Sequence, residues 1–246
     1  MSLASANVCT FYESTSRAKL SSVNFSARRS LVFEQFRSAK ISCFGLQESR
    51  ANETRIYHVE NYLVVTSKCD KFRNYGIETC IDTKFKINAC SASFEAVTLI
   101  CAEPTILLIS VQFGSWLVHF LNFHAPHCEA KAARGDHKKM TVAQRKAWWK
   151  RLSDICSNLD PRFPLFVFCD ANATMGSAVS QHVSSHGAAL SNVNSVFFAS
   201  FLRDRNLFLP ATFHQYHSGS SHTYTPTIAE GNRIDYVAIP FDIPCG

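Results

Sequence analysis

Two apolar runs separated by only two residues place the strongest constraint on how this chain folds. Residues 105–113 (TILLISVQF) and 116–123 (WLVHFLNF) are rich in β-branched and aromatic side chains, and Gly114-Ser115 stands between them. A glycine in first place of a two-residue connection is typical of the tight turn that closes a β-hairpin. The pattern therefore predicts an antiparallel hairpin, and these are the clearest strands in the sequence.

Short strand-like runs and longer helical patterns alternate through the rest of the chain. Apolar residues recur at helical spacing over 31–39, and the compact apolar run 41–46 follows, which predicts a helix and then a buried strand. Further along, we expect a buried strand at 164–169, a helix at 194–204 and a strand at 233–239. Helices and hairpins are mixed without strict βαβ alternation, which favours an α/β fold.

One helix carries an explicit start signal. Thr141 and Gln144 have the spacing of a capping box. The periodicity behind them predicts that the helix turns Trp148, Leu152 and Ile155 towards the core, while Arg145 and its neighbouring basic residues fall mostly on other faces.

Composition restricts the class of protein. The 246 residues contain no internal repeat and no long linker, so we expect a single domain over residues 1–246. Because 46% of the residues are hydrophobic and only 18% are charged, a largely disordered chain is excluded. The net charge of +6 is compatible with a polyanionic partner and equally with an ordinary solubility charge. The longest apolar stretch is too short to cross a bilayer as a helix, so no membrane segment is expected.

Ten cysteines are present, but none forms a C-x-x-C pair or a cluster with histidine at zinc spacing. Cys43, Cys101 and Cys169 lie inside apolar runs, where cysteine behaves as a small hydrophobic residue. With no secretory segment visible, the pattern favours free thiols in a reducing, intracellular setting.

Polar side chains interrupt four apolar runs at or near their ends. These are Gln47-Glu48, Asn122 with His124, Asp170 with Asn172, and Asp235. Taken singly, each is about twice as often a solvated strand end or a satisfied internal hydrogen bond as a functional group. Together they supply carboxylates for a hard cation such as Mg²⁺, a general base for water, and donors for the charge that develops on a phosphate. Spacing alone does not show that they converge.

Five short motifs in a fixed order resemble the endonuclease/exonuclease/phosphatase superfamily. They are SANVCTF, CFGLQES, LNFHAPH, VFCDANA and GNRIDYVAIP, and they extend over essentially all 246 residues. The superfamily includes abasic-site endonucleases, DNase I and the endonuclease domains of non-LTR retrotransposons. GLQES, HAPH and the HTYTP that precedes RIDYV are most similar to the retrotransposon type. The resemblance implies a DNase I-like four-layer sandwich, in which two packed mixed β-sheets are flanked by helices.

The resemblance also implies roles for the motif residues. Glu48 would bind Mg²⁺, with Mn²⁺ as the alternative ion, and Asn7 would lie close to the same site. Asp170 would orient or deprotonate the attacking water, and Asn172 would hydrogen-bond the water or the phosphate. His124 stands where many relatives have the tyrosine of Tyr-x-Pro-Asn, so an imidazole whose charge depends on pH near neutrality would replace a phenol.

Further positions are assigned by the same resemblance. His127 replaces the asparagine of Tyr-x-Pro-Asn. Residues 68–76 form a basic loop with aromatic residues, and it either contacts phosphates through Arg73 and Tyr75 or is simply solvated. Cys9 stands where some abasic-site enzymes have an acid, which puts a second metal contact in doubt.

Asp235 would orient the histidine of a Ser-Asp-His motif that relatives carry on a closing strand. Neither that motif nor the strand follows Asp235 in the sequence. The expectation is therefore a fold that lacks the closing C-terminal strand, in either a truncated gene product or a weakly active relative.

These observations leave three functions open. The leading hypothesis is a Mg²⁺-dependent endonuclease of retrotransposon origin that nicks DNA, with RNA as the alternative nucleic-acid partner and no obligate protein partner evident. The second is a phosphatase or phosphodiesterase of the same fold acting on RNA or small phosphoesters, because fold alone does not choose the substrate. The third is an inactive remnant that binds nucleic acid. A retrotransposon origin would imply a nuclear location.

Overall fold

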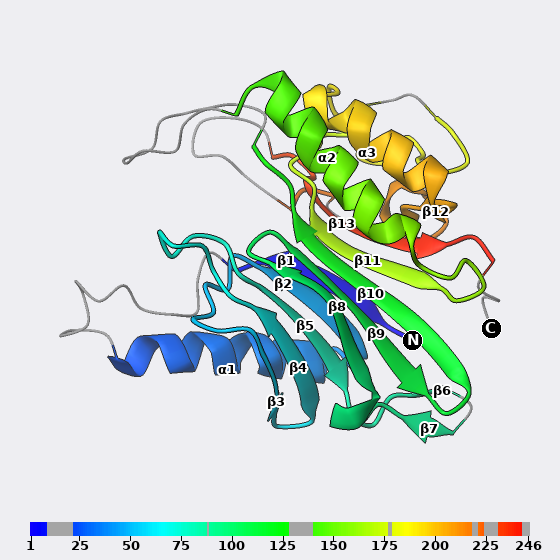
Figure 1. Ribbon diagram of the computed structural model, residues 1–246. Helices are drawn as coiled ribbons and strands as arrows, with labels where there is room; N and C mark the ends of the chain where they lie inside the picture. The colour runs from blue at the N-terminus through cyan, green and yellow to red at the C-terminus, as the bar shows by residue number, and fades with distance from the viewer. Residues whose placement is uncertain are drawn as a thin grey trace. The chain divides into compact units, whose positions relative to one another are not determined.

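The structure is a computed structural model that describes residues 1–8, 22–87, 89–127, 140–176, 179–217, 221–223 and 231–242, with the backbone alone at 22–27 and 94. Cys9, where the sequence departs from the resemblance, lies outside the described residues. The chain forms two compact units, Met1–His124 and Ala125–Gly246 (Figure 1).

The first unit contains a mixed five-stranded sheet. Its strands, in spatial order, are β1 (Leu3–Asn7), β2 (Cys43–Gln47), β5 (Ile77–Asp82), β4 (Tyr62–Ser67) and β3 (Arg55–Val59). β1 runs parallel to β2 and the other neighbours are antiparallel. In this parallel pair Asn7 of β1 lies opposite Gln47 of β2. Asn7 and Glu48, the residue after Gln47, therefore lie at the same end of the sheet.

Helix α1 (Ser22–Ser38) covers one face of this sheet (Figure 1). Phe33 of the helix is fully buried against alternate residues of the strands, including Phe44, Tyr62 and Val64. The three aromatic rings meet edge to face at centroid separations of 5.0–5.6 Å. Such pairs add about 0.5–1.5 kcal/mol each to their burial. The predicted order of helix and then buried strand at 31–46 is confirmed.

The other face of the sheet packs against an antiparallel set of longer strands. β8 (Val97–Glu103), β9 (Ile106–Phe113) and β10 (Trp116–His124) form this set, and β9 and β10 are the predicted hairpin. Gly114 has φ +61° in the connecting turn, a conformation that few other residues adopt without strain. The first unit also contains the short pair β6 (Lys86–Ile87) and β7 (Cys90–Ser91) and the 3₁₀ turn η1 (Phe94–Ala96).

The second unit sets two helices against antiparallel strands (Figure 1). Its elements are α2 (Val142–Ser157), β11 (Leu165–Asp170), α3 (Val193–Asp204), β12 (Leu207–Phe208), the 3₁₀ turn η2 (Pro210–Thr212) and β13 (Asp235–Pro240). β13 pairs with β11 on one side and β12 on the other. Phe198 of α3 links the layers, since its ring lies 5.8 Å from Trp149 of α2 and 5.5 Å from Tyr236 of β13.

The inward face of α2 differs from the prediction. The capping box of Thr141 and Gln144 is present as expected. However, Trp149 rather than Trp148 is the buried tryptophan, and Arg145, expected elsewhere, is only 4% exposed. The Arg145 guanidinium tolerates burial because its Nη1 donates to the carbonyl oxygens of His127 and Met140. The packing partner of the helix, rather than its own periodicity, fixes its rotation.

The predicted α/β class, with two large mixed sheets and few helices, is confirmed. The expectation of a single domain stays a prediction. Among the described residues, seven cysteines are free thiols, as the sequence suggested. Within those same residues, no helix combines the length and the apolar character needed to span a bilayer.

Candidate functional site

Asn7 and Glu48 meet at the end of two neighbouring strands. Asn7 is the last residue of β1, and Glu48 follows β2 with φ +56°, an uncommon value for a residue with a side chain. The Asn7 Nδ2 donates to the Glu48 Oε1 at 3.0 Å. This bond fixes the direction of a carboxylate whose side chain is still 22% exposed, so the carboxylate is held in place and open to a ligand.

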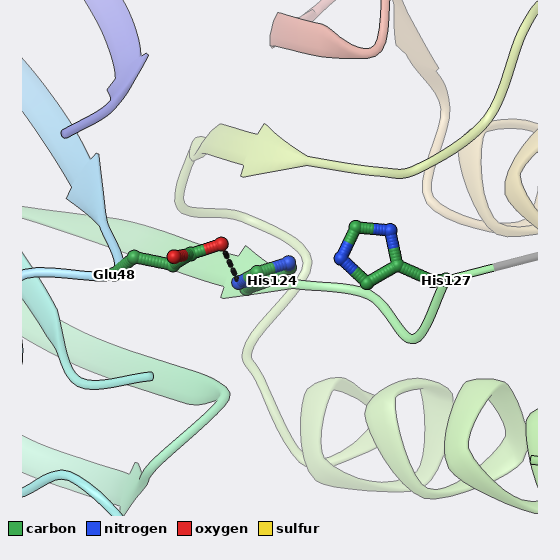
Figure 2. Close-up of side chains that lie close together, drawn as sticks. All are labelled: Glu48, His124 and His127. Atoms are coloured by element: carbon green, nitrogen blue, oxygen red, sulfur yellow. Dashed lines mark ion pairs between the residues drawn. The ribbon is translucent and has the colours of Figure 1, made fainter. Parts of the chain in front are cut away.

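His124, the last residue of β10, faces the same carboxylate (Figure 2). Its Nδ1 lies 3.8 Å from the Glu48 Oε1, and its side chain is 1% exposed. The ring of Tyr75 packs edge to face against the imidazole at a centroid distance of 5.3 Å. Burial raises the pKa of Tyr75, and the negative charges of Asp70 and Glu48 raise it further. The phenol therefore stays neutral and can act as a hydrogen-bond donor.

The loop 68–76 is anchored to the residues that follow Glu48. The amides of Ser49 and Arg50 donate to the carbonyls of Gly76 and Tyr75, at 3.0 and 2.8 Å. Gly76 has φ +83°, and a Cβ there would lie 2.9 Å from the Arg50 nitrogen. Of the two residues predicted from this loop, Tyr75 packs against His124, the residue that faces Glu48. Arg73 is exposed and lies in a turn with φ +60°.

A buried pair of amides lies one residue before Glu48 and two before His124. The Gln47 Nε2 donates to the Asn122 Oδ1 at 2.6 Å, and the Asn122 Nδ2 donates to the Glu78 carbonyl at 2.8 Å. Gln47 and Asn122 are both fully buried. Their hydrogen bond connects the two packed sheets of the first unit at the strand ends that carry Glu48 and His124. Sequence reasoning noted both residues as polar strand ends but did not pair them.

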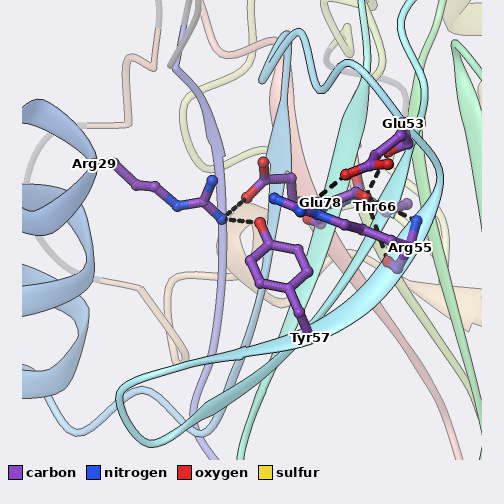
Figure 3. A network of polar contacts seen from close by, with 7 residues as sticks. Arg29, Glu53, Arg55, Tyr57, Thr66 and Glu78 are labelled. Atoms are coloured by element: carbon purple, nitrogen blue, oxygen red, sulfur yellow. Dashed lines mark hydrogen bonds and ion pairs between the residues drawn. The ribbon is translucent and has the colours of Figure 1, made fainter. Parts of the chain in front are cut away.

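Glu78 is a buried acid that sequence reasoning missed (Figure 3). Its Oε2 forms an ion pair with the Arg29 Nη2 of α1 at 2.7 Å, and the same guanidinium donates to the Tyr57 hydroxyl. Burial raises the pKa of Glu78 to about 6, although the positive charge of Arg29 opposes the shift. Glu78 is the acid in the strand pattern IETCID, and nothing in that pattern distinguishes a buried, ion-paired acid from an exposed one.

The second unit brings together three further predicted residues. Asp170 ends β11 and stands directly opposite Asp235, the first residue of β13. Residues opposite one another in an antiparallel pair project from the same face of the sheet. Asp170 is 1% exposed, and its Oδ1 accepts the Asn172 amide at 3.0 Å. Asn172 has φ +44°, a conformation that asparagine adopts more readily than most residues.

The segment directly after His124 is tied to Asp170 and Asn172. The Ala125 amide donates to the Asp170 carbonyl at 2.8 Å, and the Ala125 carbonyl accepts from the Asn172 Nδ2 at 2.7 Å. Asn194, fully buried at the start of α3, donates through its Nδ2 to the carbonyls of Pro126, Ala171 and Asn172. Sequence reasoning missed Asn194, because it looks like any polar residue in the first turn of a helix.

Three further contacts hold the strand that carries Asp235. The buried Tyr236 hydroxyl lies 2.9 Å from the Ala173 carbonyl and 2.8 Å from the Arg233 carbonyl. Burial raises the pKa of Tyr236, so the hydroxyl keeps its proton. The Thr223 hydroxyl accepts the Asp235 amide at 3.1 Å. The remaining predicted residue, His127, is exposed, and its carbonyl is held by Arg145.

Comparisons with known proteins identify the fold. No protein-family model matches the chain, and no curated protein matches it. Solved structures do match. An AP endonuclease from Leishmania major has a TM-score of 0.63 at 12% identity, covering 98% of this chain and 78% of that one. An AP endonuclease from Archaeoglobus fulgidus has a TM-score of 0.58 at 11% identity, covering 96% and 84%.

A third match is the endonuclease domain of TRAS1, a telomere-specific non-LTR retrotransposon, with a TM-score of 0.54 at 12% identity, covering 87% of this chain and 79% of that domain. All three structures have the DNase I-like fold. The chain therefore has this fold, as its motifs indicated. The TM-scores of 0.54–0.63 show the fold, and the identities of 11–12% leave the activity to be argued from the residues.

Proposed function

We propose that this protein is a divalent-metal-dependent phosphodiester hydrolase that nicks DNA. The observation that carries the proposal is the anchored carboxylate of Glu48, held by Asn7 at 3.0 Å and faced by His124 at 3.8 Å. The solved structures of similar fold, each described as an endonuclease or endonuclease domain, support the same class of chemistry.

The donor set around Glu48 fits a divalent cation. Carboxylate and amide oxygens are the ligands that Mg²⁺ prefers, and Mn²⁺ accepts imidazole nitrogen as well. Glu48 and Asn7 would hold the ion. Glu48 and His124, both in the first unit, each offer a ligand atom of a type that a divalent ion accepts (Figure 2). When bound, the ion would supply positive charge to the phosphate oxygens.

Asp170 is the proposed general base. Its carboxylate is buried and oriented by the Asn172 amide, which is the arrangement expected of a group that takes a proton from water in a fixed direction. The Asn172 Nδ2 donates to the Ala125 carbonyl, which fixes the side chain, and Asn172 is proposed to hydrogen-bond the water or the phosphate. Asp235, on the same face as Asp170, is proposed to orient an imidazole.

The phosphate-contacting groups complete the proposal. His124 and Tyr75 would donate hydrogen bonds to the oxygens of the scissile phosphate, where donors stabilise developing negative charge. The exposed side chains of Arg73 and His127 would contact neighbouring phosphates of the nucleic acid. Contacts of this kind position the backbone of DNA without reading its sequence.

A substrate panel tests this function. The full chain is incubated with MgCl₂ and either supercoiled plasmid, RNA, phosphomonoesters or phosphoinositides, and both nicking and phosphate release are recorded. The expected result is nicking of the plasmid without phosphate release. Release of inorganic phosphate from the monoesters with an intact plasmid would identify a phosphatase instead. Binding of DNA with no turnover of any substrate would identify an inactive remnant.

Variants connect any turnover to the site. Asp170→Asn should lower the rate of nicking by about 10²-fold or more, since it removes the base but keeps the shape of the side chain. Asp154→Asn is the matched control, because Asp154 is an exposed aspartate of α2 whose carboxylate pairs with Lys150. Equal activity of the two variants would contradict the assignment of Asp170.

A further inference from the structure

Phe72 is an apolar ring that the basic loop 68–76 holds in water. The residue is 71% exposed, more than either Trp116 at 45% or Tyr216 at 54%. Single exposed apolar residues are ordinary on protein surfaces, so exposure alone gives Phe72 no function. The backbone that carries the ring and the charges around it do distinguish this position.

The turn that carries Phe72 is closed by hydrogen bonds to one aspartate. The Asp70 Oδ1 accepts the amides of Phe72 and Asn74 at 2.9 and 2.7 Å. The Asp70 amide donates to the Asn74 carbonyl at 3.0 Å, and the Arg73 amide donates to the Asp70 carbonyl at 3.0 Å. These four bonds fix the direction in which the ring leaves the chain. A ligand of the ring therefore meets a preorganised turn, which reduces the entropy lost on binding.

The loop places Phe72 close to the proposed phosphate-contacting groups of the first unit. The Cys69 amide donates to the Ala51 carbonyl at 2.8 Å, which ties the start of the loop to the segment after β2. Near its end, Tyr75 packs against His124 at a ring separation of 5.3 Å. Phe72 precedes Tyr75 by three residues, so their Cα atoms are at most about 11 Å apart. That distance corresponds to roughly three nucleotides of a DNA strand, which rises about 3.4 Å per nucleotide.

The charges around the ring suit a nucleic-acid strand. Lys68, Lys71 and Arg73 are exposed, and the Lys71 Nζ lies 5.0 Å from the centroid of the Phe72 ring. The one acid of the loop, Asp70, directs an oxygen at two backbone amides. Cations that contact phosphates, combined with an aromatic ring on which a base can stack, are the features that bind single nucleic-acid strands.

We propose that Phe72 stacks on a base of the bound DNA near the scissile phosphate, while Lys71 and Arg73 contact phosphates beside that base. This inference rests on the proposed hydrolysis of DNA and adds a preference to it. Every base of a regular duplex is already stacked, and a mismatched base costs least to unstack. The preferred substrate is therefore DNA in which a base near the cleaved bond is mismatched or unpaired.

The test measures the affinity of the full chain for a fluorescein-labelled duplex with one central mismatch and for the same duplex without it. EDTA is present, so that binding is measured apart from metal-dependent hydrolysis. The wild type should bind the mismatched duplex more tightly. Phe72→Ala should weaken that binding by about 10-fold and abolish the preference. Trp116→Ala is the matched control, because Trp116 is an exposed ring at the start of β10, about 27 Å along the strand from His124, and it should change neither value.

Two further substitutions separate the ring from the charge. Phe72→Trp should keep the preference, and its tryptophan emission should fall on addition of the mismatched duplex by more than that of the wild type, since stacking on a base quenches the indole. Lys71→Gln should keep the preference but lower the slope of log affinity against log salt concentration by about one. Phe72→Ala removes no charge and should leave that slope unchanged.

Three results would overturn the proposal: equal binding of both duplexes by Phe72→Ala and the wild type, an unresponsive emission in Phe72→Trp, or an equal loss in Trp116→Ala. Nicking of plasmid in MgCl₂ distinguishes this failure from that of the proposed function. Nicking with no effect of Phe72→Ala on binding would remove the stacking contact and keep the hydrolysis. The expected binding differences without nicking would do the reverse. Because Phe72 is exposed, its variants should fold, and their thermal unfolding midpoints verify this.

Discussion

The hydrogen bond between Gln47 and Asn122 should be measurable as both stability and activity. Asn122→Leu keeps the approximate shape of a fully buried side chain but removes two hydrogen bonds, of 2.6 and 2.8 Å. Each of the two buried groups left without that partner, the Gln47 amide and the Glu78 carbonyl, costs about 1–3 kcal/mol. We therefore expect the free energy of unfolding to fall by about 2–6 kcal/mol.

A double-mutant cycle separates the pairwise contribution from the cost of each substitution. Gln47→Met and the combined variant Gln47→Met/Asn122→Leu complete the cycle, with urea unfolding of each chain followed by circular dichroism. Since the second substitution removes a partner that is already lost, the combined variant should be less destabilised than the sum of the single variants by about 1–2 kcal/mol. Gln112→Met is the matched control, because that exposed side chain donates to the nearby Gly114 carbonyl, and the substitution should change stability by less than about 0.5 kcal/mol.

Asn122→Leu should also reduce nicking, because it removes the hydrogen bond that connects the strand ends before Glu48 and His124. The rate of nicking is measured without urea, at a temperature at which each variant remains folded. This separates the effect on nicking from unfolding. A strictly additive cycle, or a loss of stability by Asn122→Leu of less than about 1 kcal/mol, would refute the reasoning that this buried pair connects the two sheets.

Three further predictions concern other groups. The pKa of Glu78 is about 6, against an ordinary 4.5, so the stability that its protonated form contributes is fully present below about pH 4.5 and is lost as the pH rises through 6. The loss amounts to about 2 kcal/mol. Urea unfolding across this pH range should show the loss in the wild type but not in Glu78→Gln. A parallel pH dependence in both chains would contradict the shift. Gly76→Ala should destabilise the chain by about 1–3 kcal/mol, since φ is +83° and the new Cβ would lie 2.9 Å from the Arg50 nitrogen; an unchanged midpoint would show that the loop relaxes freely. Tyr236→Phe should cost about 1–3 kcal/mol through loss of the buried hydroxyl, and a neutral effect on thermal unfolding would show that its contacts contribute nothing.

Local patterns predicted the elements of the fold well. The hairpin around Gly114 was visible because its apolar runs and its turn residue lie within about twenty consecutive positions. The capping box before α2 was visible for the same reason. The rotation of α2 was not, because adjacent tryptophans differ by about 100° on a helix and only the packing partner decides between them. Trp149 faces inward because Phe198 of another helix lies there.

The residues proposed for the candidate site came from motifs, whereas their supporting contacts gave no signal in the sequence. Ordered motifs pointed to Glu48, Asp170 and Asp235, whose roles stay predictions. The contacts of Glu78 with Arg29, and of Asn194 with three carbonyls, join residues far apart in the sequence. Such pairs depend on how strands and helices pack, and no spacing along the chain reports them.

The most direct test of the proposed function is the rate at which the full chain converts supercoiled plasmid to the open circle with and without MgCl₂. The proposal predicts conversion that requires the divalent ion, that falls by about 10²-fold or more in Asp170→Asn, and that stays at the wild-type rate in Asp154→Asn. Conversion that persists in excess EDTA, or that is equal in the two aspartate variants, would contradict it.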